Sequence, residues 1–218
     1  MDPLQPPYWD EACAELAARD PILAGLIETH KADVLRGSGD AFRTLVNAIV
    51  GQQISVAAAD GIWTRLLAAY PGIRATDLAR AAVEDLRSVG LSWRKAEYIQ
   101  GIATAFASGA VDDSAWADRS DEEVRDALTN LRGVGPWTAD MLLIFHLKRP
   151  DVLPLGDIGL VNAASALYRW DVDAEASAAR RLAARQHVLA QHAEQWRPWR
   201  TVATWFIWRD LDAEPVIY

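Results

Sequence analysis

The most informative stretch of this 218-residue chain reads Leu131-Arg132-Gly133-Val134-Gly135-Pro136-Trp137-Thr138-Ala139. Apolar residues with helical spacing lie on both sides of it, so it is predicted to form a short loop between two helices. Two glycines in such a loop expose backbone N–H groups at the N-terminus of the second helix, a geometry that binds a phosphate. No strand precedes the glycines and no third glycine follows, which excludes a Rossmann-type site. On the local pattern alone, a glycine-rich turn that binds nothing is the alternative.

The segments around this loop are also helical in pattern. Ser120 and Glu123 have the spacing of a capping box, which predicts a helix that starts there and ends at Gly133. Apolar spacing predicts further helices at residues 137–147, 157–168, 174–193 and 198–211. No convincing alternating strand pattern occurs, so the predicted fold class is all-α.

Composition and charge narrow the function classes. The chain is 51% hydrophobic and 24% charged, as in a globular protein, and it has no apolar run long enough to span a membrane and no signal sequence, so a cytoplasmic location is expected. Its single cysteine, Cys13, and four histidines offer no spacing for a disulfide, zinc or an iron–sulfur cluster. The net charge of −8 argues against a nucleic-acid partner, but residues 131–209 hold 10 basic and 7 acidic residues. One electropositive face is therefore compatible with the sequence.

Three segments that follow one another in the correct order carry a family resemblance. They are Gly51-Gln52-Gln53-Ile54-Ser55-Val56-Ala57-Ala58-Ala59, the 131–139 stretch with Asp157 following 22 positions after Gly135, and Trp196-Arg197-Pro198-Trp199-Arg200 with Phe206-Ile207-Trp208. Over about residues 10–211 the chain resembles the helix-hairpin-helix DNA glycosylase superfamily, and within it the 3-methyladenine DNA glycosylase II branch.

The resemblance implies both an activity and an architecture. The activity is hydrolytic removal of N-alkylated bases, chiefly 3-methyladenine and 7-methylguanine, from duplex DNA after the nucleotide is flipped out. The architecture is two interleaved helical lobes with the active site in the cleft between them. The central lobe is expected over 41–110 and 111–155, and the second over 1–40 plus 156–218. Residues 1–218 then form one glycosylase core, without the N-terminal β-rich domain of some relatives.

Asp157 is the catalytic carboxylate that the resemblance implies. Its alternative role is an ordinary N-cap for the helix that follows Gly156, and the two roles are compatible because a helix N-terminus stabilises an anion. The carboxylate would stabilise the sugar cation or activate water, and the sequence leaves these two functions open. An alkylated purine already carries positive charge, so no second acid is needed to protonate the leaving base.

The pocket for the damaged base is expected to contain Trp137 and Trp208, whose electron-rich rings would stack on a cationic base. For most of the ten tryptophans, a place in the core is the default. Trp137 also occupies the position of the Schiff-base lysine of the family's glycosylase/lyases, which predicts a monofunctional enzyme with no lyase activity. Met141 replaces an aromatic residue of some relatives. The more open pocket this suggests extends the expected substrates to 1-methyladenine and 3-methylcytosine.

The remaining site residues concern the grip on DNA. Gln52 and Gln53 lie where the family inserts a wedge into the space left by the flipped nucleotide, and the alternative is a solvated helix end. The resemblance assigns the DNA phosphate to Gly133, Gly135 and Thr138. It assigns a monovalent cation, Na⁺ or K⁺, to the backbone carbonyls of Thr129, Leu131 and Val134, while no cofactor is required for the reaction.

Two readings of function stay open at this point. The first is a monomeric glycosylase acting on double-stranded DNA with alkylated bases, with no membrane partner. The alternative is a non-catalytic helix-hairpin-helix module that only binds DNA. Asp157 together with Trp137 and Trp208 favours the enzyme, because a phosphate grip alone needs no acid facing aromatic rings. The preferred lesion, the metal occupancy and the oligomeric state are not fixed by the sequence.

Overall fold

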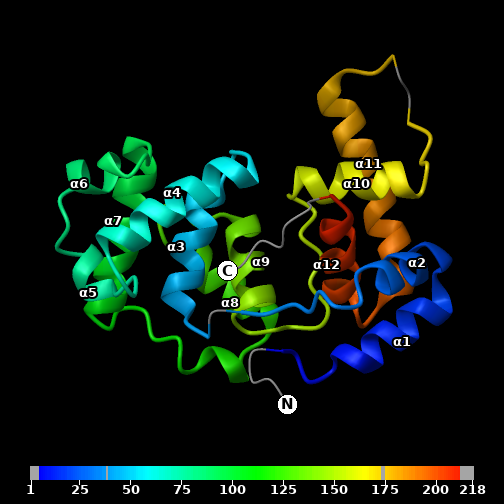
Figure 1. The fold of residues 1–218 in the computed structure, drawn as a ribbon, viewed down its shortest axis with the longest axis horizontal. Coiled ribbons are helices and arrows are strands. Elements are labelled where there is room, and N and C mark those ends of the chain that lie inside the picture. The colour runs from blue at the N-terminus through cyan, green and yellow to red at the C-terminus, as the bar shows by residue number, and fades with distance from the viewer. Residues whose placement is uncertain (1–4, 38, 173–174, 212–218) are drawn as a thin grey trace. The chain divides into compact units, whose positions relative to one another are not determined.

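The structure is a computed structural model that describes residues 5–37, 39–172 and 175–211, and all regular structure in these residues is helical (Figure 1). The predicted all-α class is therefore confirmed. The elements are α1 (Trp9–Arg19), α2 (Pro21–Thr29), α3 (Ala41–Gly51), α4 (Val56–Ala69), α5 (Ala75–Leu78), α6 (Val83–Ser88), α7 (Trp93–Ala107), η1 (Trp116–Asp118), α8 (Asp121–Thr129), α9 (Pro136–Phe145), α10 (Ile158–Leu167), α11 (Ala178–His192), η2 (Ala193–Trp196) and α12 (Arg200–Leu211).

The described chain forms two compact units. Gly37–Leu147 form a continuous stretch that we call the central unit. The residues up to Arg36 and those from Lys148 onward form the terminal unit, which joins α1 and α2 to α10, α11 and α12. The second segment of the terminal unit thus begins at Lys148, before the residue 156 expected from the sequence, and it includes the whole loop that leads to Asp157.

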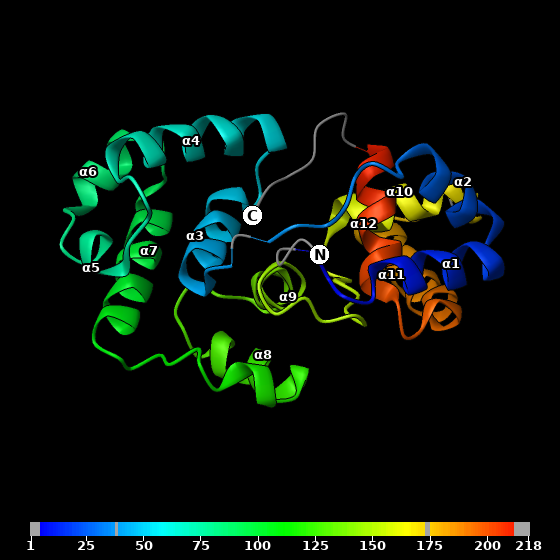
Figure 2. The same ribbon diagram turned by 60° about the horizontal axis from the view of Figure 1, so that its bottom comes forward.

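The core of the central unit is built around α3 and α9. Both helices are apolar on nearly all sides, a pattern typical of buried helices, and every residue of α9 from Thr138 to Phe145 is buried. Figure 2 shows α9 end-on between α3 and α8, and α3 also packs against α4 and α7. The hairpin between α8 and α9 is consequently held by a rigid element on its C-terminal side.

The core of the terminal unit is built around α12. Its residues from Thr201 to Ile207 are all buried, and the helix packs against α1, α2 and α10. Asp20 links the two distant segments, because its carboxylate accepts hydrogen bonds from Tyr168 Oη at 2.7 Å and from Trp196 Nε1 at 2.9 Å. The N-terminal helices are therefore tied to the C-terminal ones by buried polar contacts as well as by apolar packing.

The capping box and the helices predicted from the sequence are found in the structure. Ser120 and Glu123 form a reciprocal capping box at the start of α8, as predicted. The four helices predicted after the hairpin correspond to α9, α10, α11 and α12, with ends that differ by a few residues. Among the described residues, no helix combines the length and apolar character needed to cross a membrane.

Candidate active site

The hairpin between α8 and α9 is closed tightly by the residues that the sequence singled out. Gly133 has φ +95°, in the left-handed region that favours glycine, and a Cβ placed there would lie 2.3 Å from Cγ of Tyr98. The Val134 N–H donates to the carbonyl of Leu131 at 3.0 Å and closes the turn. Only glycine therefore fits at position 133, because the ring of Tyr98 from α7 packs directly on the backbone there.

The N-terminus of α9 is the predicted phosphate site. Gly135 is the N-cap and Pro136 occupies the first turn, and the Ala139 N–H donates to the Gly135 carbonyl at 3.0 Å as the first intrahelical bond. The N–H groups of a helix that precede its first such bond have no intrahelical partner, and the helix dipole favours an anion beside them. Gly135 also has open space around its missing Cβ, so a ligand backbone can approach closely.

Gln52 and Gln53 behave differently although they are adjacent. Gln52 Nε2 donates to Thr138 Oγ1 at 2.8 Å and to the Gly133 carbonyl at 3.0 Å, which ties the turn after α3 to the hairpin. Gln53 is exposed, and its φ of 57° lies in the left-handed region that few non-glycine residues adopt. Of the two predicted wedge residues, Gln53 is thus the one displayed to solvent, and Gln52 supports the turn from behind.

Lys95, on α7, completes this arrangement, although no sequence motif marks it. Its Nζ donates to the carbonyls of Val50 at 2.8 Å and Gln52 at 2.7 Å. It thus supplies hydrogen bonds to carbonyl groups at the C-terminal end of α3, which have no partner within the helix. Burial lowers the pKa of Lys95 from its ordinary value. The side chain therefore acts as a fixed donor in the central unit, joining α7 to the turn that carries Gln53.

The two helices of the hairpin are also joined by an ion pair. Arg125 Nε on α8 lies 2.7 Å from Oδ1 of Asp140 on α9, and Asp140 is buried. Burial raises the pKa of Asp140, and the hydrogen bond and charge of Arg125 oppose that effect. This pair fixes the spacing of α8 and α9 behind the turn that joins them.

The predicted base-pocket residues lie on two different helices. Trp137 is half-buried in the first turn of α9, and Met141 follows one turn later with only 1% of its surface exposed. Trp208 is half-buried on α12 in the terminal unit. The structure therefore brings Trp137 and Met141 together on α9 and places Trp208 in the unit that also holds Asp157.

Asp157 stands at the N-terminus of α10 in the terminal unit. Its Oδ1 accepts from the Leu160 N–H at 2.7 Å, which makes it the N-cap, and its own N–H donates to the Pro154 carbonyl at 2.9 Å. A Cβ added at Gly159 would lie only 3.1 Å from Oδ1, so the small residue there leaves room for the carboxylate. Ile158, next in the chain, is 57% exposed. The carboxylate is thus held at a helix N-terminus beside an exposed apolar side chain.

The carbonyl groups predicted to hold a monovalent cation belong to the turn that follows α8. Thr129 ends that helix, and Leu131 and Val134 are joined by the turn hydrogen bond. Neutral backbone oxygens are the ligands that alkali cations take in proteins, so the donor chemistry of the turn fits such an ion. Among the described residues, no cluster of His, Cys, Asp and Glu could hold a different metal.

The chemistry available in each unit follows from these placements. In the central unit, the N-terminus of α9 has the geometry that could hold an anion, and the exposed Gln53 stands on a turn that Gln52 and Lys95 support. The terminal unit offers one carboxylate at a helix N-terminus, and α10, which carries it, packs against α12, which carries Trp208. A single carboxylate held at a helix N-terminus can stabilise a developing cation or orient a water molecule.

Comparisons with known proteins identify the family of the chain. Residues 46–186, more than half of the chain, match the family described as HhH-GPD superfamily base excision DNA repair protein. DNA-3-methyladenine glycosylase 1 of Schizosaccharomyces pombe is 30% identical over 193 residues, covering 86% of this chain and 79% of the relative. The putative DNA-3-methyladenine glycosylase YfjP of Bacillus subtilis is 28% identical over 87% of this chain, which spans 66% of that relative's length.

Solved structures give the same result at the level of the fold. The Schizosaccharomyces pombe 3-methyladenine DNA glycosylase Mag1, in complex with abasic DNA, is similar with a TM-score of 0.77 and 26% identity, covering 94% of this chain and all of that one. A DNA-3-methyladenine glycosidase of Bacillus halodurans is similar with a TM-score of 0.69 and 32% identity, covering 92% of this chain and 88% of the other.

Proposed function

The chain belongs to the HhH-GPD superfamily of base excision DNA repair proteins, and from this premise we propose that it is a monofunctional DNA glycosylase that removes N-alkylated bases from duplex DNA. The observation that carries the proposal is Asp157, a carboxylate held as the N-cap of α10 inside the matched region 46–186. The names of the relatives, several of them 3-methyladenine glycosylases, support the substrate class.

The reaction needs little from the protein beyond position and charge. The flipped alkylated base carries a positive charge, which makes it a good leaving group, and Trp137 and Trp208 would stack on it. As the glycosidic bond breaks, the Asp157 carboxylate stabilises the cationic sugar or accepts a proton from the attacking water. Its hydrogen bond to the Leu160 N–H fixes the direction in which the carboxylate points.

The specificity we propose is broad. Stacking and charge select for a cationic base in general, so 3-methyladenine and 7-methylguanine are the chief substrates, and 1-methyladenine and 3-methylcytosine are included. Trp137 provides no amine for a Schiff base, so the abasic strand is left uncut.

We assign the binding of DNA to the central unit. A phosphate would bind at the N-terminus of α9 next to Gly135, and Gln53 would enter the stack while Gln52 and Lys95 hold its turn in place. A Na⁺ or K⁺ ion on the carbonyls of Thr129, Leu131 and Val134 would add positive charge beside that phosphate. We propose that one monomer acts on one lesion.

The test is base release from methylated duplex DNA by the wild type and by Asp157→Asn. Asparagine keeps the shape and the capping oxygen but removes the charge, so we expect release to fall at least about a hundredfold while DNA affinity stays within about twofold. Asp40→Asn is the matched control, because Asp40 is likewise a helix N-cap whose side chain accepts from a backbone N–H. That variant should keep full activity.

Each result separates the readings. Equal release by Asp157→Asn and the wild type would move the catalytic role to another residue. If the wild type bound DNA but released no alkylated base, the chain would instead be a helix-hairpin-helix binding module. Strand cleavage with trapping by borohydride would contradict the monofunctional assignment.

A further inference from the structure

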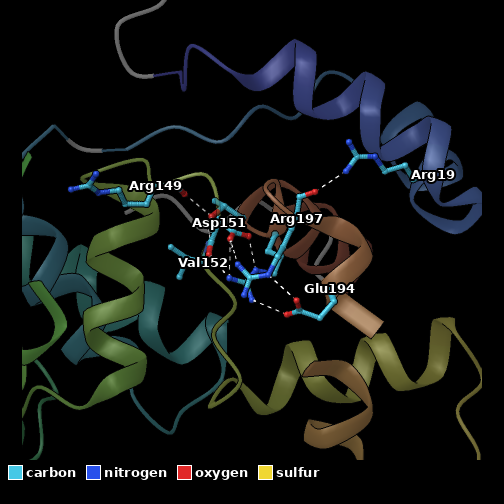
Figure 3. A network of polar contacts seen from close by, with 8 residues as sticks. Arg19, Arg149, Asp151, Val152, Glu194 and Arg197 are labelled. Carbon is cyan, nitrogen blue, oxygen red and sulfur yellow. Dashed lines mark hydrogen bonds and ion pairs between the residues drawn. The ribbon is translucent and has the colours of Figure 1, made fainter. Parts of the chain in front are cut away.

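The loop of residues 148–156 leads directly into Asp157 and has no regular secondary structure of its own. Such a loop is ordinarily mobile unless other elements satisfy its backbone groups. Here several of its backbone groups are bonded to α11 and α12, the helices that follow α10 in the terminal unit. Figure 3 shows Arg149, Asp151 and Val152 of this loop. The position of the proposed catalytic carboxylate therefore depends on how firmly these two helices hold the loop.

Thr201, in the first turn of α12, makes three of these bonds. Its Oγ1 donates to the Arg149 carbonyl at 2.6 Å and accepts from the Val152 N–H at 3.0 Å. Its backbone N–H donates to the Pro150 carbonyl at 3.0 Å. Thr201 and Val152 are both fully buried, so water cannot replace these contacts if the hydroxyl is removed.

A charged cluster reinforces the same part of the loop. Asp151 accepts from Arg200 Nε at 2.5 Å and Nη2 at 3.0 Å and from Arg197 Nη1 at 2.5 Å, and Arg200 Nη2 also donates to the Asp151 carbonyl at 3.0 Å. Glu194 joins the same cluster (Figure 3), with its Oε2 3.0 Å from Arg197 Nε and its Oε1 3.7 Å from Arg200 Nη1. Two-pronged contacts of this kind fix the orientation of both partners.

The last anchor before the carboxylate is Gln186 on α11. Its Nε2 donates to the Leu155 carbonyl at 2.8 Å, two residues before Asp157. The Asp157 N–H then bonds to the Pro154 carbonyl at 2.9 Å, so the chain turns into α10 directly after this anchor. Any displacement of Leu155 is transmitted through this single turn to the N-cap.

We propose that Thr201 and Gln186 are positioning residues that hold the 148–156 loop and thereby place the Asp157 carboxylate for base release. The inference rests on the proposed glycosylase function. Thr201 holds the first part of the loop, at residues 149–152, and Gln186 holds its last part, at Leu155. The Asp151 cluster keeps the first part aligned with α12. A misplacement of about 1 Å at a reacting group lowers a rate by about a hundredfold, so the loss of either anchor acts on the rate through Asp157.

The chain supplies a matched control for each variant. Thr201→Val removes the bonded hydroxyl, and Thr204→Val removes a hydroxyl one turn later on α12 that is equally buried and has no hydrogen-bond partner among the described residues. Gln186→Glu replaces the donor by an oxygen facing the Leu155 carbonyl, and Gln191→Glu makes the same charge change at an exposed position of α11. Thr201→Ser keeps the hydroxyl and should therefore keep the wild-type rate of base release.

Single-turnover release of 7-methylguanine and affinity for duplex DNA with an abasic analogue are measured for all of them. Thr201→Val and Gln186→Glu should release the base between about tenfold and a hundredfold more slowly, with affinity within about twofold of wild type, while Thr204→Val, Gln191→Glu and Thr201→Ser keep the wild-type rate. In an Asp157→Asn background, Thr201→Val should not lower the rate of base release any further, because Thr201 acts through the carboxylate that this variant lacks. Thr201→Val and Gln186→Glu rates equal to their controls, or a full additional loss in that background, would overturn the proposal.

Backbone amide hydrogen exchange separates this proposal from the glycosylase proposal. The N–H groups of Val152 and Asp157 should exchange faster in Thr201→Val and Gln186→Glu than in the two controls, whatever the protein does to DNA. Unchanged protection would show that the loop needs neither anchor and would refute the inference. A wild type that releases no base, with the exchange difference present, would refute the glycosylase proposal and with it the catalytic purpose of the loop anchors.

Discussion

Asp20 is a carboxylate, only 3% exposed, that four groups hydrogen-bond at once. Oδ1 accepts from the N–H groups of Ile22 and Leu23, and Oδ2 accepts from Tyr168 and Trp196. Burial raises the pKa of Asp20, but these four hydrogen bonds outweigh it and leave the pKa below its ordinary value of 3.8. The ionised form is thus the one that the folded terminal unit stabilises.

Asp20→Asn should destabilise the protein by about 2 kcal/mol at pH 7, because the single oxygen of the amide cannot accept from both the two rings and the two backbone N–H groups. An acid whose pKa is lowered by folding contributes stability above its unfolded pKa and loses it as the pH falls through the folded value. The difference in free energy of unfolding between wild type and variant should therefore be constant from pH 7 to about 5, and it should become smaller below about pH 4. Urea unfolding across this range measures it, and a gap as large at pH 3 as at pH 7 would contradict the assignment to charge.

Individual site residues differ in how much the sequence says about them. The motif predicts that Gln52 and Gln53 lie at one turn. Adjacent side chains of a turn point in different directions, however, and only the structure shows that Gln52 supports the turn while Gln53 is exposed. Lys95 was missed because its partners are backbone carbonyls, one of them 43 positions earlier, and carbonyls leave no trace in side-chain patterns. Thr201 was missed for the same reason.

At the scale of elements, long helices with caps were predictable and short ones were not. The capping box of α8 and the apolar spacing of α11 leave clear patterns because each helix runs for two turns or more. Helix α5 has four residues and α6 has six, too few for any apolar period to repeat. Their positions are set by packing against α7, which no local pattern encodes.

The hairpin between α8 and α9 gives a prediction from its two glycines. Gly133→Ala should destabilise the protein by about 3 kcal/mol, because alanine meets both a positive φ and the ring of Tyr98. Gly135→Ala should fold like the wild type, since φ there is −99° and no atom lies within 4 Å of the added carbon, yet its affinity for DNA should fall. Thermal unfolding and DNA titration of both variants measure this.

The two variants test two separate statements about the hairpin. Wild-type stability of Gly133→Ala would contradict the close packing of Tyr98 on the turn. Wild-type DNA affinity of Gly135→Ala would contradict the approach of a phosphate to the N-terminus of α9.

At the scale of the whole molecule, DNA binding has to overcome a net charge of −8. Affinity then depends on a few well-placed cations together with backbone N–H groups, and each phosphate that a cation neutralises adds about 0.9 to the slope of log affinity against log salt. Arg132, next to Gly133, is a suitable cation. Its side chain is 76% exposed, it lies over the ring of Tyr98, and its Nη2 is 3.3 Å from Glu97.

Arg132→Gln should lower the magnitude of that salt slope by about 0.9, and it should weaken binding to damaged and undamaged duplexes alike. Arg74→Gln is the control, because Arg74 is also exposed and paired with a carboxylate, Asp77 at 2.8 Å, but follows a different turn, before α5. Fluorescence anisotropy at several salt concentrations measures both. Identical slopes for the two variants would remove Arg132 from the DNA-binding surface.

The discontinuous make-up of the terminal unit has a consequence for how the chain folds as it is synthesised. Residues Gly37–Leu147 are contiguous, so the central unit can complete its core while the ribosome is still adding later residues. Helices α1 and α2 are made before the central unit, but the groups that cover Trp9, Leu16 and Leu23 include α12, which is made after it. The apolar faces of α1 and α2 therefore stay uncovered while the whole central unit is synthesised, and a chaperone would protect them from aggregation during that time.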